Sequence, residues 1–118
     1  MRIIETFQDQ SADFVQTIEL DGIVISMRLV FNTRSESWYI NEYQELDTDK
    51  KLYGIKLVKS YPLIFAMKTR IDLPGDFMVI KEDESIEDEI TYDNLNKGWN
   101  LYYMTALEIA AWRLENGI

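Results

Sequence analysis

The fold is decided by one stretch, FVQTIELDGIVISMRLVF, which spans residues 14–31. Two runs of alternating residues flank the pair Asp21-Gly22, which suits the positive φ angles of a type I′ turn. A two-residue turn there gathers the apolar side chains of both runs on one face, so turn chemistry and strand periodicity agree on the register. The expected pairs on that face are Leu20 with Ile23, Ile18 with Ile25, Gln16 with Met27, and Phe14 with Leu29. The sequence therefore predicts a β-hairpin.

The rest of the chain predicts further short strands and one terminal helix. Runs rich in aromatic and β-branched residues are typical of strands. We expect such strands at 38–43, 52–58, 77–80 and 99–103. Pro62 interrupts the segment 61–67, which is therefore an edge strand or an irregular packed loop. A capping box, Thr105-x-x-Glu108, begins a helix that ends near Asn116.

These elements predict the fold class. The chain has 118 residues, which is an ordinary size for one domain. We expect a single domain over residues 1–118 that is mostly β: a small barrel-like antiparallel domain of six or seven strands, with a C-terminal helix over about 105–116.

Composition excludes several classes of function. The chain has 12 Lys and Arg against 21 Asp and Glu, a formal net charge of −9. Tight nucleic-acid binding normally needs a basic surface that replaces phosphate counterions, and an anionic membrane surface needs the same. The chain has no Cys and no His, which removes disulfides, thiol nucleophiles, imidazole bases and most zinc or haem sites.

Catalytic motifs are absent as well. The sequence has no Gly-x-Ser-x-Gly elbow, no Ser-x-x-Lys pair and no Gly-rich phosphate loop. We therefore expect no enzyme, no cofactor, no metal site and no small-molecule substrate. The longest apolar runs are about five residues, such as 63–67, so we expect no signal peptide and no membrane span. The protein is then made and kept in the cytoplasm, or leaves it by a route other than secretion.

Residues 82–89 form an acidic run with six carboxylates in eight positions. A divalent cation favours several oxygen ligands, but the run lacks the Asp-x-Asp-x-Asp-Gly pattern of a calcium loop. A solvated loop is the favoured interpretation. Placed next to the strand at 77–80, such charge discourages pairing with the strand of another chain.

Two binding functions stay open from the residues alone. The first is an acidic inhibitor that mimics the phosphate backbone of a nucleic acid. The second is a binding module that resembles the five-stranded OB-fold and uses the segment Lys50–Arg70, where basic residues gather among aromatic ones.

The order of motifs resembles one known family. The segments that carry the resemblance are Asn32-Thr33-Arg34-x-x-x-Trp38-Tyr39, Gly54-Ile55-Lys56-Leu57-Val58, Leu73-Pro74-Gly75 and Thr91-Tyr92-Asp93-Asn94-Leu95. They lie between about Phe14 and Tyr103, in an order similar to that of baseplate plug proteins of contractile-tailed phages, including the cyanophage type. The helix expected at the C-terminus is longer than this resemblance implies.

The resemblance implies a structural, non-enzymatic part of the virion. Such a plug would lie on the tail axis between tail tube and spike and would contact tube, hub and spike proteins in a symmetric assembly, with DNA passing nearby. The interface or structural residues that it suggests are Arg34, Trp38, Tyr39, Gly54 and Lys56. Gly54 marks a bulge, a sharp bend or the close approach of another backbone, and Lys56 is the expected polar contact to a neighbouring subunit.

Overall fold

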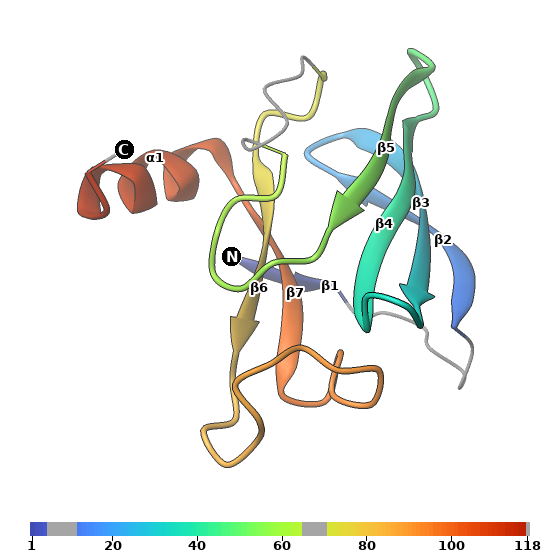
Figure 1. The fold of residues 1–118 in the computed structure, drawn as a ribbon. Helices are drawn as coiled ribbons and strands as arrows, with labels where there is room; N and C mark the ends of the chain where they lie inside the picture. Colours follow the sequence, from blue (N-terminus) through green and yellow to red (C-terminus); the bar gives the residue numbers. More distant parts are fainter. Residues whose placement is uncertain (5–11, 65–70, 118) are drawn as a thin grey trace.

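The computed structural model describes residues 1–4, 12–64 and 71–117, and its elements form two antiparallel sheets and one helix (Figure 1). The three-stranded sheet has the order β1-β7-β6, and the four-stranded sheet has the order β2-β3-β4-β5. The elements are β1 (Arg2–Ile4), β2 (Asp13–Leu20), β3 (Ile23–Asn32), β4 (Ser37–Glu45), β5 (Lys50–Lys56), β6 (Asp76–Lys81), β7 (Trp99–Met104) and α1 (Ala106–Glu115). The prediction of a mostly β fold with a C-terminal helix is confirmed.

The β2–β3 hairpin has the predicted register. Leu20 pairs with Ile23 and Phe14 with Leu29, and all the intervening pairs follow. Asp21 has φ 50° and Gly22 has φ 78°, as a type I′ turn requires.

A bulge crosses the middle of the four-stranded sheet. The pairing of β3 with β4 shifts register between Arg28 and Leu29, and Asn41 is the extra residue of β4. Gly54 lies at the same level of β5, with φ +67°, and an added Cβ there would meet nothing within 4 Å. Gly54 therefore provides the backbone conformation of a bulge, and within the described residues nothing packs where its side chain would project.

The three-stranded sheet contains a strand that the sequence did not reveal. β1 is three residues long, and it pairs with the outer edge of β7 so that Ile4 lies opposite Leu101. Both side chains are fully buried. Three residues are too few to display an alternating pattern, which is why no sequence periodicity pointed to β1.

The expectation of a barrel is wrong, because the described strands form two separate sheets. Beyond β5 the chain makes one isolated parallel bridge to β6, between Lys59 and Val79. The next residue, Ser60, donates its amide to the carbonyl oxygen of Val79 at 2.8 Å but has φ +50°, which a continuing strand does not adopt. No ladder within the described residues joins β5 to β6, so the sheets face each other without closing.

The segment 61–67 is an irregular packed loop as far as it is described. Leu63 and Ile64 are buried, and the Leu63 amide donates to the carbonyl oxygen of Phe77 at 3.0 Å. The Ile64 amide donates to the Asp76 carboxylate at 2.8 Å. The remainder of this expected segment, residues 65–67, lies outside the described residues.

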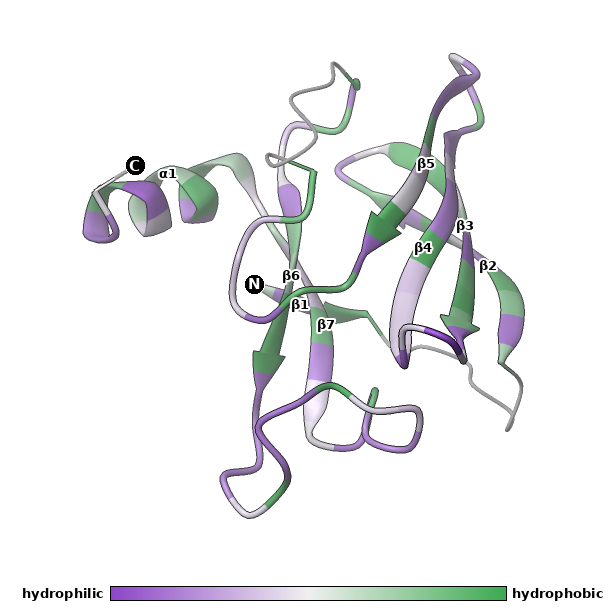
Figure 2. Cartoon of the chain, viewed as in Figure 1, coloured by the Kyte–Doolittle hydropathy of each residue, from purple (hydrophilic) through white to green (hydrophobic). Residues whose placement is uncertain are grey.

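The hydrophobic core lies between the two sheets. Figure 2 shows apolar and polar colours alternating along the strands, while the loop that follows β6 is mostly hydrophilic. The inner face of the larger sheet contributes the fully buried Met27, Ile40 and Tyr43, and the smaller sheet contributes Phe77 and Leu101. The edge of the Tyr43 ring meets Phe77 with centroids 6.2 Å apart, which joins the two sheets directly.

Helix α1 projects from the end of β7 (Figure 1). The predicted capping box is present: the Glu108 amide donates to the Thr105 hydroxyl at 3.3 Å, and the Thr105 amide donates to the Glu108 carboxylate at 3.0 Å. Of the helices in the described chain, none is long and apolar enough to cross a membrane.

Candidate functional site

An aromatic cluster forms one end of the core. The alternation of β4 directs Trp38 inward, where its side chain is only 1% exposed. Trp38 stacks on Tyr92 with ring centroids 5.7 Å apart, and Phe31 meets both rings edge-on. The indole N–H of Trp38 donates to the carbonyl oxygen of Thr91 at 3.1 Å. These contacts fix the loop around Thr91 against the β3–β4 hairpin.

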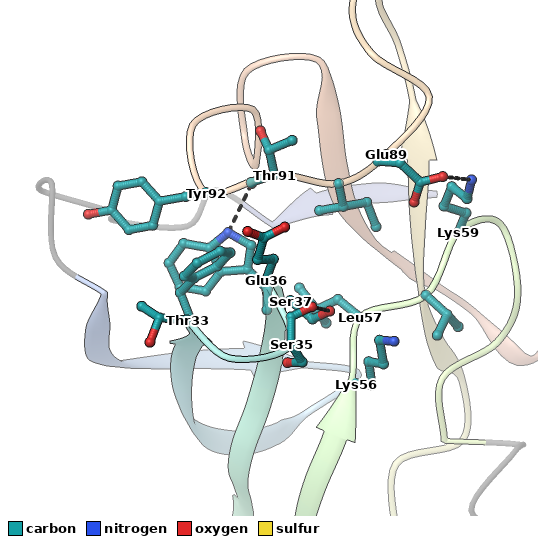
Figure 3. Close-up of a pocket in the computed structure, with 14 residues that line it drawn as sticks. Thr33, Ser35, Glu36, Ser37, Lys56, Leu57, Lys59, Glu89, Thr91 and Tyr92 are labelled. Carbon is teal, nitrogen blue, oxygen red and sulfur yellow. Dashed lines mark hydrogen bonds and ion pairs between the residues drawn. The ribbon is translucent and has the colours of Figure 1, made fainter.

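A groove of about 670 Å³ opens above this cluster (Figure 3). Three segments form it: the β3–β4 turn, the end of β5 with the residues that follow it, and the loop at 89–92. Its apolar floor is rimmed by hydroxyl groups and four charged side chains. The lining residues are Phe31, Thr33, Ser35, Glu36, Ser37, Trp38, Lys56, Leu57, Val58, Lys59, Glu89, Ile90, Thr91 and Tyr92.

Two of the four charged side chains on the rim form an ion pair, and the other two do not. The Lys59 ammonium and the Glu89 carboxylate form an ion pair at 3.1 Å across the groove. Within the described part of the chain, Lys56 and Glu36 have no ion-pair partner. The groove thus combines an apolar floor with hydroxyl groups and one unpaired charge of each sign. Such a lining is complementary to a protein segment that presents both apolar and polar groups.

The five residues suggested by the sequence do not form one cluster. Trp38 lies on the inner face, whereas Tyr39 and Lys56 are cross-strand partners on the outer face. Lys56 also lines the groove, so it joins the two surfaces. Arg34 is exposed in the β3–β4 turn, where no described carboxylate pairs with its side chain, and Gly54 forms the bulge. Tyr39 reaches back to that turn through Ser35, with hydroxyl oxygens 3.5 Å apart.

The acidic run is a loop tied to the protein by individual contacts. The Lys81 ammonium bonds to Asp88 at 2.9 Å, which raises the pKa of Lys81 and lowers that of Asp88. Asp83 accepts hydrogen bonds from the amide and hydroxyl of Ser85, and these lower its pKa. Glu82 accepts a hydrogen bond from the phenol of Tyr102. No group of three or more acidic residues that could hold a metal ion occurs in the described ranges.

The basic segment is largely neutralised where it is described. Lys50 pairs with Asp72 at 2.6 Å, and Lys51 lies 3.8 Å from Asp49. The pairing of Lys59 with Glu89 belongs to the groove. Lys68 and Arg70 lie outside the described residues. The OB-like alternative therefore gains no continuous basic surface from the described side chains.

A buried carboxylate that the sequence did not reveal fixes the loop before β6. Glu45 is 1% exposed, and its two oxygens accept hydrogen bonds from the Asp72 amide, the Leu73 amide and the Tyr43 phenol, each at 2.8 Å. Burial, followed by the hydrogen bond to Glu45, raises the pKa of Tyr43 above its usual range. A glutamate in an alternating strand carries no sequence signal of burial, so only the fold identifies this contact.

Comparison with known proteins provides the family. The family model described as cyanophage baseplate Pam3 plug gp18 matches residues 1–106. No curated protein matches the chain. The match includes both sheets and every residue of the groove, and it ends at the first residue of α1. The chain belongs to the family of cyanophage baseplate plugs and is a component of the phage baseplate.

Proposed function

We propose that this protein closes the axial hub region of a contractile baseplate, between tail tube and spike, as a purely structural part. The observation that carries the proposal is the family match over residues 1–106. In this role the whole chain acts as one domain, contacts hub, spike and tube proteins, and performs no catalysis. The lack of His and Cys supports the last point, because the usual bases and nucleophiles are missing.

The groove above Trp38 is the proposed contact with a neighbouring baseplate protein. Its floor is held rigid by the Trp38–Tyr92 stack, so a partner segment meets a surface that needs little ordering on binding. Lys56 and Arg34 are exposed cations without described carboxylate partners, on a protein whose net charge is −9. They suit carboxylates of the partner and fix its register.

The protein's net charge also suits a position beside the DNA path. Like charge removes the phosphate attraction that would retain passing DNA. Six of the 21 acidic residues lie in the loop at 82–89, which makes this loop the element to test. Replacing several of its carboxylates with lysines is expected to slow DNA ejection, and unchanged ejection would remove this part of the proposal.

The first experiment is quantitative mass spectrometry of purified particles and of isolated tails. The proposal requires this chain at a fixed ratio to the tail-tube protein in both samples. Absence from particles, with the free protein abundant in infected cells, would contradict the axial role and favour an acidic inhibitor.

The second experiment tests the rim of the groove at Lys56 and the exposed β3–β4 turn beside the groove at Arg34. Arg34→Glu and Lys56→Glu are each expected to reduce incorporation into particles several-fold. Both variants should stay folded, because both side chains are exposed. Lys97→Glu, an exposed lysine outside the groove, is the matched control and should incorporate normally. Equal incorporation of all three variants would show that the partner binds elsewhere.

A further inference from the structure

The two unpaired charges of the groove lie at different levels along the strands. Lys56 is the cross-strand partner of Tyr39, whereas Glu36 is the residue immediately before β4. Both residues are exposed and line the groove, and neither forms an ion pair within the described part of the chain. Figure 3 shows Glu36 on the side of the β3–β4 turn and Lys56 on the side of β5. The groove therefore has one negative and one positive position, separated along its lining.

An exposed apolar side chain lies between these two positions. Val58 follows Lys56 by two residues, is 37% exposed and lines the groove. The Leu57 amide donates to the carbonyl oxygen of Trp38 at 2.9 Å, which extends the β4–β5 pairing by one residue beyond Lys56. Val58 is therefore nearer than Lys56 to the turn that carries Glu36. The order along this side of the groove is positive, apolar, negative.

The other two charges on the rim neutralise each other. The ion pair of Lys59 with Glu89 adds no net charge to the groove, so Glu36 and Lys56 determine its polarity. The carboxylates of Glu36 and Glu89 both face a ligand in the groove, and they would repel the phosphates of a nucleic acid. The lining therefore favours a protein segment that presents one charge of each sign.

Glu36 has a backbone conformation that glycine favours. Its φ is +53°, in the left-handed region that few other residues adopt. The turn is held by Asn32, whose side-chain oxygen accepts the amides of Arg34 at 2.9 Å and Ser35 at 3.2 Å. The Glu36 side chain makes no hydrogen bond or ion pair within the described ranges, so it does not hold the turn. Residues in this conformation are concentrated at ligand contacts, which is consistent with a binding role for the carboxylate.

We propose that the groove binds an extended segment of a neighbouring baseplate protein in which one basic and one acidic side chain flank an apolar one. This inference rests on the role proposed above for the groove. The basic side chain contacts Glu36, the acidic one contacts Lys56, and the apolar one covers Val58. Lys56 and Val58 have the two-residue spacing of one strand face, which an extended segment matches with its own alternate side chains. A segment with two like charges meets repulsion at one position, so the two residues together select the partner.

Short peptides test this selection without the rest of the baseplate. The mixed peptide is acetyl-Ser-Lys-Thr-Leu-Thr-Glu-Ser-amide, the basic peptide has lysine in place of its glutamate, and the acidic peptide has glutamate in place of its lysine. NMR follows the Val58 amide and the indole N–H of Trp38 in the groove, with the indole N–H of Trp99, outside the groove, as the reference. We expect a Kd of about 1 mM for the mixed peptide and about fivefold weaker binding of the other two. Weaker binding of the basic peptide cannot come from the net charge of −9, which attracts it.

Charge reversal on the protein changes which peptide is preferred. Glu36→Lys is expected to bind the acidic peptide about fivefold more tightly than the mixed one, and Lys56→Glu is expected to prefer the basic peptide by the same factor. Glu19→Lys, at an exposed carboxylate of β2 outside the groove, is the matched control and should prefer the mixed peptide as the natural chain does. All three variants should stay folded, because the three positions are exposed, and an unchanged Trp99 signal verifies it.

The selected charge pattern and the role of the groove in the baseplate fail in different ways. Equal binding of the three peptides would overturn the charge pattern, and so would unchanged groove signals at about 10 mM peptide. A loss of particle incorporation by Lys56→Glu would in that case still support the groove as the baseplate contact. Normal incorporation of Lys56→Glu, together with selection among the peptides, would overturn the baseplate contact and support the binding preference alone.

Discussion

The turn between β2 and β3 and the loop that precedes β6 meet at the same phenol. Tyr103 donates to the Asp21 carboxylate at 2.5 Å and accepts from the Gly75 amide at 3.1 Å. The conformation of the turn is determined by its own two residues, Asp21 and Gly22, which both adopt positive φ. The loop has its conformation from distant groups, of which Glu45 is the most buried. One region therefore depends on local backbone preference, and the other depends on long-range hydrogen bonds.

The largest effect is expected from removing the carboxylate that holds the loop. Glu45→Ala leaves the part-buried Asp72 amide, the buried Leu73 amide and the buried Tyr43 phenol without their acceptor. At about 1–3 kcal/mol for each unsatisfied donor, partly relieved by water, we expect a loss of about 3–5 kcal/mol. Urea unfolding measures it. Glu19→Ala, at an exposed position in β2, should stay within about 0.5 kcal/mol. A similar small loss for Glu45→Ala would show that the loop does not depend on this contact.

The second effect tests the space around Gly75. An added Cβ would overlap the Met104 carbonyl oxygen and lie 2.5 Å from the Tyr103 hydroxyl. Gly75→Ala is therefore expected to destabilise the protein by about 1–3 kcal/mol through overpacking. Thermal and urea unfolding measure the loss. Retention of full stability would mean that the loop moves away from β7 at little cost.

The third effect is alkaline sensitivity. Burial and the hydrogen bond to Glu45 raise the pKa of Tyr43 in the folded protein, while the unfolded chain titrates near the usual value of 10.0. Above pH 10 the unfolded state loses this proton and the folded state keeps it, so stability falls as pH rises. The slope approaches about 1.4 kcal/mol per pH unit for this group. Tyr43→Phe is expected to flatten the decline between about pH 10 and 12, and an identical decline would assign it to other groups.

The smallest effect tests the turn. Gly22 has a positive φ, which the turn still requires in Gly22→Ala, and the added Cβ would meet nothing within 4 Å. The cost is then one of backbone conformation, about 1 kcal/mol. Gly54→Ala shares both properties and is the matched comparison. A loss above that of Gly75→Ala would contradict the distinction between the two regions.

Sequence reasoning succeeded where the signal is local. The register of the β2–β3 hairpin and the capping box at Thr105 both follow from a few neighbouring residues. Sequence reasoning failed where the structure depends on contacts between residues that lie far apart in the sequence. Trp38 and Tyr92 lie far apart in sequence, and nothing in either segment predicts that their rings stack. Closure of a barrel likewise depends on how β5 meets β6, which no local pattern encodes.

The three tryptophans lie in three different surroundings. Trp38 and Trp99 are buried in the body, with indole N–H groups bonded to the carbonyl oxygens of Thr91 and Glu87. Trp112 is half-buried on α1 beside Tyr61. The chain therefore has its own fluorescent reporters for body and helix. With Trp112→Phe the emission follows only the body, and the difference from the natural chain follows α1, so detachment of the helix can be observed separately from unfolding.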